Sequence, residues 1–202
     1  VLTDMNQVLG WAAGNAVEVK EAVEYLKGES VNPRLHKITL ELCAELLVLS
    51  KTATTIDEAK VKLQKVLDNG KALEKFAQMV SALGGPNDFC ENPDKYLPKA
   101  AIVCPVFAER EGYVIGQDTR GIGLSIIELK GGRITPEQKL DYATGYSNFC
   151  QLGDKVDTQK PLAVVHAQTE EQFVAAQDNL RKLVTIGDVP IAQQPEIIEK
   201  IG

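Results

Sequence analysis

The chain opens with the stretch Leu2-Thr3-Asp4-Met5-Asn6-Gln7-Val8-Leu9-Gly10-Trp11-Ala12-Ala13-Gly14-Asn15-Ala16-Val17-Glu18-Val19-Lys20-Glu21. We expect the fold to be organised around it. We interpret it as an irregular loop that leads into a helix, with Gly10 and Gly14 permitting backbone conformations closed to other residues. Asn15 is a good N-cap, and Glu18, three residues later, completes a capping-box pattern. Such a loop leaves amides and carbonyls able to face a ligand. An ordinary helix entry fits the same spacing.

Four helices are predicted over the first 84 residues, because apolar residues recur at helical spacing between clear start and stop signals. The first helix begins after Asn15 and ends at Gly28. Asn32-Pro33 and the capping box that begins at Thr55 announce the second and third helices. Asn69-Gly70 ends the third, and a fourth follows. We interpret His36 as an ordinary residue on the surface of the second helix.

The character of the sequence changes after a proline-rich connector at residues 85–98. Residues 101–107 form a strand candidate in which Pro105 indicates an edge position or an irregularity. A second strand is expected at 113–115, a helix at 119–130, a hairpin at Gly153-Asp154 and a strand at 162–167. Thr169 begins a further capped helix, and the residues from Gly187 onward are expected to be extended.

Composition narrows the classes of function. The net charge of −6 argues against a general nucleic-acid or anionic-membrane surface. No apolar run approaches the roughly 18 residues of a membrane span. Four widely spaced cysteines fit reduced thiols in a cytoplasmic protein, and with His36 and His166 they form no zinc-ligand spacing. Nothing in the sequence supports a Cys–His nucleophilic pair.

Several blocks of the sequence, in order and across nearly the whole chain, carry a family resemblance. They resemble the thymidine and pyrimidine-nucleoside phosphorylases, and the first block is the most specific. The blocks are Asp4–Gly10, Gly14–Ala16, Glu18–Ala22, Val66–Ala72, Lys95–Pro98, Asp118–Arg120, Leu152–Val156 and Pro161–Ala167.

The resemblance implies an α/β protein, with α+β character within this chain. Residues 1–98 would be the helical portion of a central α/β domain plus a connector. Residues 99–202 would be the small C-terminal α/β-hammerhead domain of the family. Four helices without strands do not complete a nucleoside-binding sheet domain, which also suggests that part of the fold lies elsewhere.

The family's phosphate-cradling loop and its pyrimidine-binding residues would precede the first residue of this chain. We therefore expect a C-terminal part with no catalytic or substrate-binding residue, inactive by itself. The full-length enzyme would be a cytoplasmic homodimer that binds phosphate and thymidine and catalyses reversible phosphorolysis without an organic cofactor. No nucleic-acid or membrane partner is expected.

A potassium site is the one metal site that the resemblance implies. Its ligands here would be the backbone carbonyls of Leu9 and Ala12 and the carboxylate of Glu21, an oxygen set suited to a hard cation. Glu21 also fits a plain acid on the helix surface. The other acidic candidates, Asp4, Glu18, Asp118 and Asp154, are interpreted as solvated faces and caps.

We also expect residues 4–14 to be loosely held, because this segment has few large apolar residues apart from Met5, Leu9 and Trp11.

One alternative class of function remains. Gly153-Asp154-x-Val156 followed by Pro161-Leu162-Ala163 resembles a half-motif of biotinyl and lipoyl carrier domains. A hairpin lysine that would bear the prosthetic group is missing, and turn geometry accounts for the Gly-Asp pair. The alternative is thus a non-enzymatic, carrier-like or scaffolding module.

Overall fold

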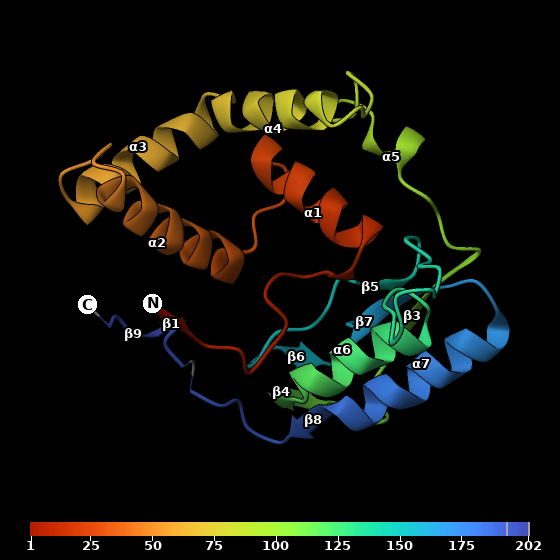
Figure 1. The fold of residues 1–202 in the computed structure, drawn as a ribbon. Helices are drawn as coiled ribbons and strands as arrows, with labels where there is room; N and C mark the ends of the chain where they lie inside the picture. The colour runs from red at the N-terminus through yellow and green to blue at the C-terminus, as the bar shows by residue number, and fades with distance from the viewer. Residues whose placement is uncertain (193, 202) are drawn as a thin grey trace. The chain divides into compact units, whose positions relative to one another are not determined.

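A computed structural model describes residues 1–192 and 194–201, which fall into two compact units (Figure 1). The helical unit comprises Val1–Thr3, Lys20–Tyr96 and the segment that begins at Glu196. The sheet unit comprises Asp4–Val19 and Leu97–Pro195. The chain therefore mixes helix and sheet, as predicted.

The helical unit contains the predicted succession of helices. The four predicted helices are α1 (Ala16–Lys27, of which the first four residues belong to the sheet unit), α2 (Pro33–Leu49), α3 (Ile56–Asp68) and α4 (Lys71–Ala82). A short fifth helix, α5 (Pro93–Tyr96), lies in the segment expected to be a connector. The predicted caps are confirmed, since the side chain of Asn32 accepts from the amide of Leu35 and that of Thr55 from Glu58. Two short strands, β1 (Leu2–Thr3) and β9 (Ile197–Glu199), pair antiparallel.

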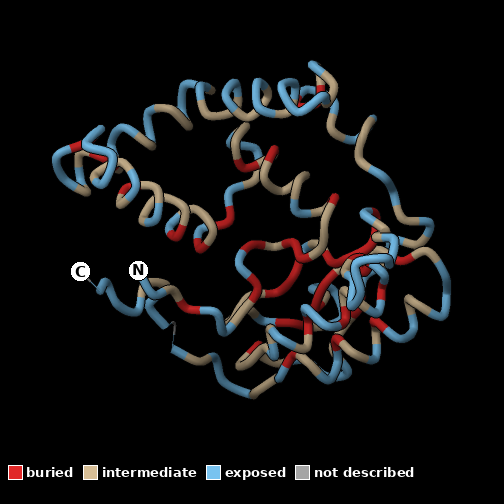
Figure 2. Tube along the Cα trace, in the orientation of Figure 1, coloured by how far each residue is buried: buried red, intermediate tan, exposed pale blue. Residues whose placement is uncertain are grey.

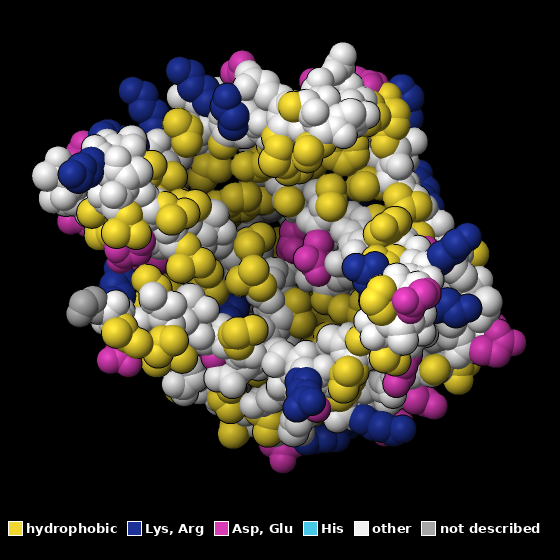
Figure 3. Space-filling view, viewed as in Figure 1, with side chains coloured by type: hydrophobic (Ala, Val, Ile, Leu, Met, Phe, Trp, Pro, Cys, Tyr) yellow, Lys and Arg dark blue, Asp and Glu magenta, His cyan; other side chains and the backbone are white. Residues whose placement is uncertain are grey.

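The core of the helices α2 and α3 is small and rich in alanine. Ala44, Ala53 and Ala59 are buried there beneath half-buried aliphatic residues. Many larger apolar side chains stay exposed, among them Leu49 and Leu83, and apolar atoms are visible around these helices in Figure 3. The helical unit thus buries few of its large apolar side chains.

His36 differs from the expected surface residue. Its side chain is half-buried, and the hydroxyl of Tyr25 lies 2.9 Å from its Nδ1 atom. The two rings are also in tilted contact. His36 therefore packs α2 against α1 within the helical unit.

The sheet unit is built from antiparallel strands. One sheet has the order β2 (Ala13–Gly14), β5 (Gly145–Ser147), β7 (Ala163–Ala167) and β3 (Ile102–Val106). The other has the order β6 (Lys155–Val156), β4 (Gly112–Gln117) and β8 (Val184–Gly187). Pro105 lies in the edge strand β3, which confirms the prediction, because an edge strand can spare an N–H donor.

The predicted hairpin at Gly153-Asp154 is wrong. These residues do form a turn, in which Gly153 has a positive φ of 86° and the amide of Asp154 donates to the carbonyl of Gln151. The strand that follows, β6, pairs with β4 rather than with β5 or β7. The turn therefore carries the chain from one sheet to the other.

Two helices belong wholly to the sheet unit and match the predicted ranges. They are α6 (Thr119–Glu128), capped by Asp118, and α7 (Glu170–Leu183), capped by Thr169. They contact each other, and α7 also contacts β3, β7 and β8. Among the described residues, no helix has the combined length and apolar character that crossing a bilayer requires.

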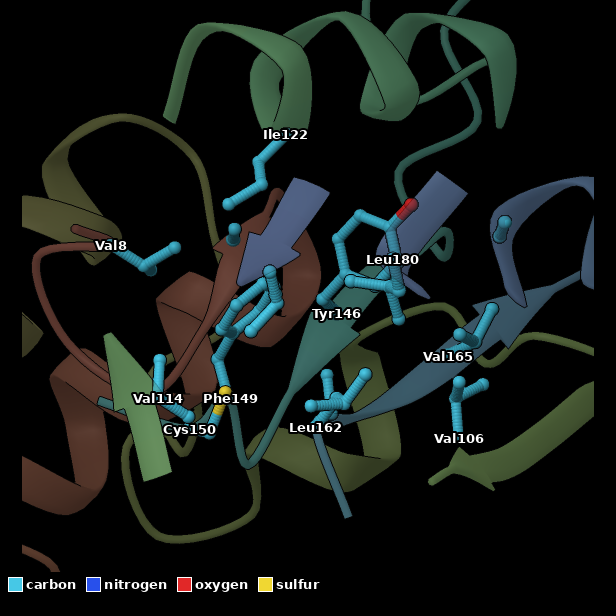
Figure 4. Close-up of a cluster of buried hydrophobic side chains, with 14 of the residues drawn as sticks. Val8, Val106, Val114, Ile122, Tyr146, Phe149, Cys150, Leu162, Val165 and Leu180 are labelled. Atoms are coloured by element: carbon cyan, nitrogen blue, oxygen red, sulfur yellow. The ribbon is translucent and has the colours of Figure 1, made fainter. Parts of the chain in front are cut away.

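One continuous core holds the sheet unit together (Figure 4). Tyr146 and Phe149 meet edge-to-face in it, and Leu180 of α7 is fully buried. Val8, from the start of the chain, belongs to the same core, only 9% exposed. Because of such contacts, residues 4–19 lie in the sheet unit, whereas the predicted domains placed them with residues 1–98.

Substitution of a buried leucine, Leu180, should destabilise the sheet unit more than substitution of an exposed one. We expect Leu180→Ala to lower the free energy of unfolding by about 2–5 kcal/mol, because it leaves a cavity in a closed core. Leu124→Ala, on the same unit but 52% exposed, should change it by less than about 1 kcal/mol. Urea unfolding followed by the fluorescence of Trp11, the one tryptophan of the chain, measures both. Equal losses would contradict the assigned core.

Candidate functional site

Residues 4–14, here called the opening loop, lie mostly outside regular structure, and five of the eleven are buried (Figure 2). Asp4, Val8 and Ala12 are each less than 10% exposed. The interpretation of Asp4 as a solvated acid is therefore wrong. Its carboxylate accepts hydrogen bonds from the backbone and side-chain nitrogens of Asn6, at 3.1 and 2.5 Å. Asp4 thus closes a local turn at the start of the loop.

Gln151 holds the middle of the opening loop. Its Nε2 atom donates to the carbonyl of Gly10 at 2.8 Å and to that of Val8 at 3.3 Å. The neighbouring amide of Leu152 donates to the side-chain oxygen of Gln7 at 3.0 Å. One short segment of the sheet unit therefore contacts three residues of the loop.

Gln117, at the end of β4, makes a second bridge. Its Oε1 atom accepts from the amide of Val8 at 3.0 Å, and its Nε2 atom donates to the carbonyl of Cys150 at 2.7 Å. Val8 is thus fixed through its N–H, its carbonyl and its buried side chain.

Two further bonds fix the ends of the loop. The hydroxyl of Thr119 donates to the carbonyl of Met5, and the amide of Phe149 donates to that of Trp11, both at 2.9 Å. The expectation of a loosely held loop is therefore wrong. The number of large apolar residues does not predict how firmly this loop is held, because hydrogen bonds to its backbone hold most of it.

The loop ends where two glycines come together. Gly14 pairs with Gly145 across β2 and β5, and both have φ near 150°, which disfavours other residues. A Cβ atom on Gly145 would lie 2.6 Å from the carbonyl oxygen of Ala13. The approach of the loop to the sheet therefore requires glycine at this point.

Asn15 occupies the predicted N-cap position of α1, since its carbonyl accepts from Val19. The capping box has a different geometry from the one expected. The carboxylate of Glu18 accepts from the amide of Gly14 at 2.7 Å, and the side-chain amide of Asn15 donates to the carbonyl of Gly131, also at 2.7 Å. Desolvation raises the pKa of Glu18, and the bond from Gly14 opposes that rise. Glu18 therefore fixes the junction between loop and helix.

The three residues of the predicted cation site fall in two places. Leu9 and Ala12 lie in the opening loop, and Glu21 lies in α1 within the helical unit. Leu9 and Ala12, the two residues predicted to bind through their backbone carbonyls, thus lie in one loop. The complete set of three ligands stays a prediction. No group of three His, Cys, Asp or Glu residues in the described part of the chain could hold a metal ion.

The remaining predicted acids have structural roles. Asp118 caps α6 by accepting from the amide of Gly121 at 2.9 Å, as expected of a cap. Asp154 accepts from the amide of Gln151 at 2.9 Å and pairs with Lys160 at 3.2 Å. Asp154 therefore helps to orient the segment that carries Gln151.

All four cysteines are free, and the Cys150 thiol is buried in the core. Burial raises the pKa of Cys150 to about 12, so its thiol is neutral at physiological pH. His166 lies with its Nε2 atom 2.8 Å from the hydroxyl of Ser147 on the neighbouring strand. Sequence analysis missed this pair, and it missed Gln117 and Gln151, because no local pattern marks a residue whose partner lies far along the chain.

Two comparisons with known families agree with this architecture. Residues 1–73 match the glycosyl transferase family a/b domain, and residues 113–187 match the pyrimidine nucleoside phosphorylase C-terminal domain. The match to the a/b domain supports a pentosyltransferase-type enzyme family, and the two matches together support a nucleoside phosphorylase-like function. Together the two matches, neither of which spans half of the chain, indicate a pyrimidine nucleoside phosphorylase-like protein.

The second match also bears on the carrier hypothesis. It covers Gly153-Asp154 and Pro161-Leu162-Ala163, so the half-motif belongs to the family's own C-terminal domain. The opening loop, in contrast, lies in the segment that matches the a/b domain. Its partners Gln117, Phe149 and Gln151 all lie in the segment that matches the C-terminal domain.

Proposed function

We propose that the full-length protein containing this chain is a thymidine phosphorylase of pyrimidine salvage. It converts thymidine and phosphate reversibly into thymine and 2-deoxyribose 1-phosphate, without an organic cofactor. The observation that carries the proposal is the presence of both family domains, in order, in one chain.

The reaction sets clear physical demands. A phosphate oxygen attacks the anomeric carbon through an oxocarbenium-like state, and the bond from that carbon to the pyrimidine nitrogen breaks. Negative charge sits on the phosphate and builds up on the departing base, so cations and backbone amides stabilise the transition state. Acidic side chains beside the base would oppose it. We assign the acids Asp118 and Asp154 to structure for this reason as well as for their contacts.

A potassium ion bound by the carbonyls of Leu9 and Ala12 and by Glu21 would supply positive charge beside the phosphate. The opening loop fits part of this set. The carbonyls of Val8, Gly10 and Trp11 accept hydrogen bonds from Gln151 and Phe149, and the carbonyl of Leu9 takes part in none of these bonds. Backbone oxygens are ligands that a hard cation prefers.

The full-length enzyme is further proposed to be a cytoplasmic homodimer without a nucleic-acid or membrane partner. The net charge of −6 supports the lack of a nucleic-acid or anionic-membrane partner, and the free cysteines support the cytoplasmic location. Light scattering of the full-length protein at micromolar concentration should give twice the mass of one chain. A monomeric mass would overturn the proposed assembly.

Thymidine should be the preferred nucleoside. With saturating phosphate, we expect kcat/KM of the full-length protein for thymidine to exceed that for deoxyuridine and uridine, measured by chromatography of the released base. The 202-residue chain alone should give no release above a mock preparation. Higher kcat/KM for uridine would overturn the substrate, and no turnover of any of the three would overturn the function.

Glu21→Gln should weaken the response to potassium, because the side chain keeps its shape and loses its charge. We expect the potassium concentration for half-maximal activity of the full-length enzyme to rise about tenfold, the effect of about 1.4 kcal/mol. The measurement is activity against KCl, with choline chloride holding the ionic strength constant. Glu29→Gln, an exposed acid just after α1, is the matched control. An unchanged response in Glu21→Gln would leave Glu21 as a surface acid.

A further inference from the structure

The opening loop belongs to one family domain by sequence and is fixed by the other. We propose that Gln117 and Gln151 are positioning residues through which the C-terminal domain holds the opening loop in the conformation that presents the carbonyl of Leu9. The role of that carbonyl as a cation ligand rests on the proposed function. The hold on the loop does not, because it rests on contacts within the sheet unit.

The bonds of Gln151 define the path of the backbone around Leu9. Its single Nε2 atom reaches the carbonyls on either side, those of Val8 and Gly10. Leu9 therefore lies between two residues whose carbonyls are both drawn to one amide group. The Leu9 side chain is 48% exposed, whereas Val8 is buried in the core. The Leu9 side chain therefore reaches solvent from a point between two residues whose carbonyls are held.

Gln117 fixes the same point from the end of strand β4. It accepts from the amide of Val8 and donates to the carbonyl of Cys150, the residue just before Gln151. The two glutamines are therefore coupled, since one braces the backbone segment that carries the other. Loss of either should loosen the loop, and loss of Gln151 should loosen it more, because two loop carbonyls lose their donor.

An amide side chain suits this task because it donates and accepts at once. Gln151→Glu gives a side chain of nearly the same shape that has no N–H when ionised. A carboxylate oxygen, which can only accept, would then face the carbonyl oxygens of Val8 and Gly10 in place of the donor. Gln117→Glu can still accept from Val8 but cannot donate to Cys150. These two variants remove donors and leave the volume of the side chain almost unchanged.

Hydrogen–deuterium exchange of the full-length protein tests the hold on the loop directly. In Gln151→Glu, we expect peptides from residues 4–14 to exchange about tenfold faster, with a smaller increase in Gln117→Glu. Gln159→Glu, the same change at an exposed glutamine of the sheet unit, should exchange like the wild type. Peptides from α7 report whether each variant is folded. Unchanged exchange in residues 4–14 of folded Gln151→Glu would overturn the proposal.

Potassium titration tests whether the hydrogen bonds from the two glutamines to the opening loop matter for the proposed potassium site. The potassium concentration for half-maximal phosphorolysis should rise about tenfold in Gln151→Glu, while kcat at saturating potassium stays within about twofold of wild type. Faster exchange with an unchanged potassium response would overturn the positioning role. A wild-type protein that does not phosphorolyse nucleosides would remove the proposed function, and exchange would still decide whether the glutamines hold the loop.

Discussion

Buried backbone groups must find hydrogen-bond partners, and in this protein that requirement falls most heavily on the opening loop. Val8, Gly10 and Ala12 are buried in a segment with no helix or strand of its own before β2. Such a segment cannot pair its own amides and carbonyls. The partners of Val8, Gly10 and Gln7 come from positions 109 to 145 residues later in the chain. The conformation of the loop therefore depends on the folding of the sheet unit.

The sheet unit is built to receive this segment. Tyr146, in β5, lies between the loop's strand β2 and the strand β7. Its ring is fully buried, its hydroxyl donates to Ser125 at 2.8 Å, and burial raises the pKa of Tyr146 to about 12. A neutral, hydrogen-bonded phenol lets a large polar residue fill the core without an unpaired group. Strand β5 thus joins the start of the chain to the main core.

Local signals predicted most of the helical elements correctly. Asn32, Thr55 and Thr169 cap their helices through bonds that span three residues, so the sequence pattern contains the whole interaction. Pro105 predicted an edge strand because its missing N–H is a property of the residue itself. The pairing of β6 with β4 and the partners of Gln117 and Gln151 depend on tertiary contacts. No window of the sequence contains both sides of such a contact.

The choice of glutamine at these positions has a consequence for electrostatics. A lysine at position 151 could also donate to the carbonyls of Val8 and Gly10, but it would bring a positive charge beside the proposed cation ligand Leu9 and repel the ion. A glutamate would attract a cation to the wrong side of the loop and could not donate. A neutral amide holds the backbone and adds no net charge. The C-terminal domain can thus shape the proposed cation ligand, and the electrostatic field at the proposed site would come from the loop carbonyls and Glu21.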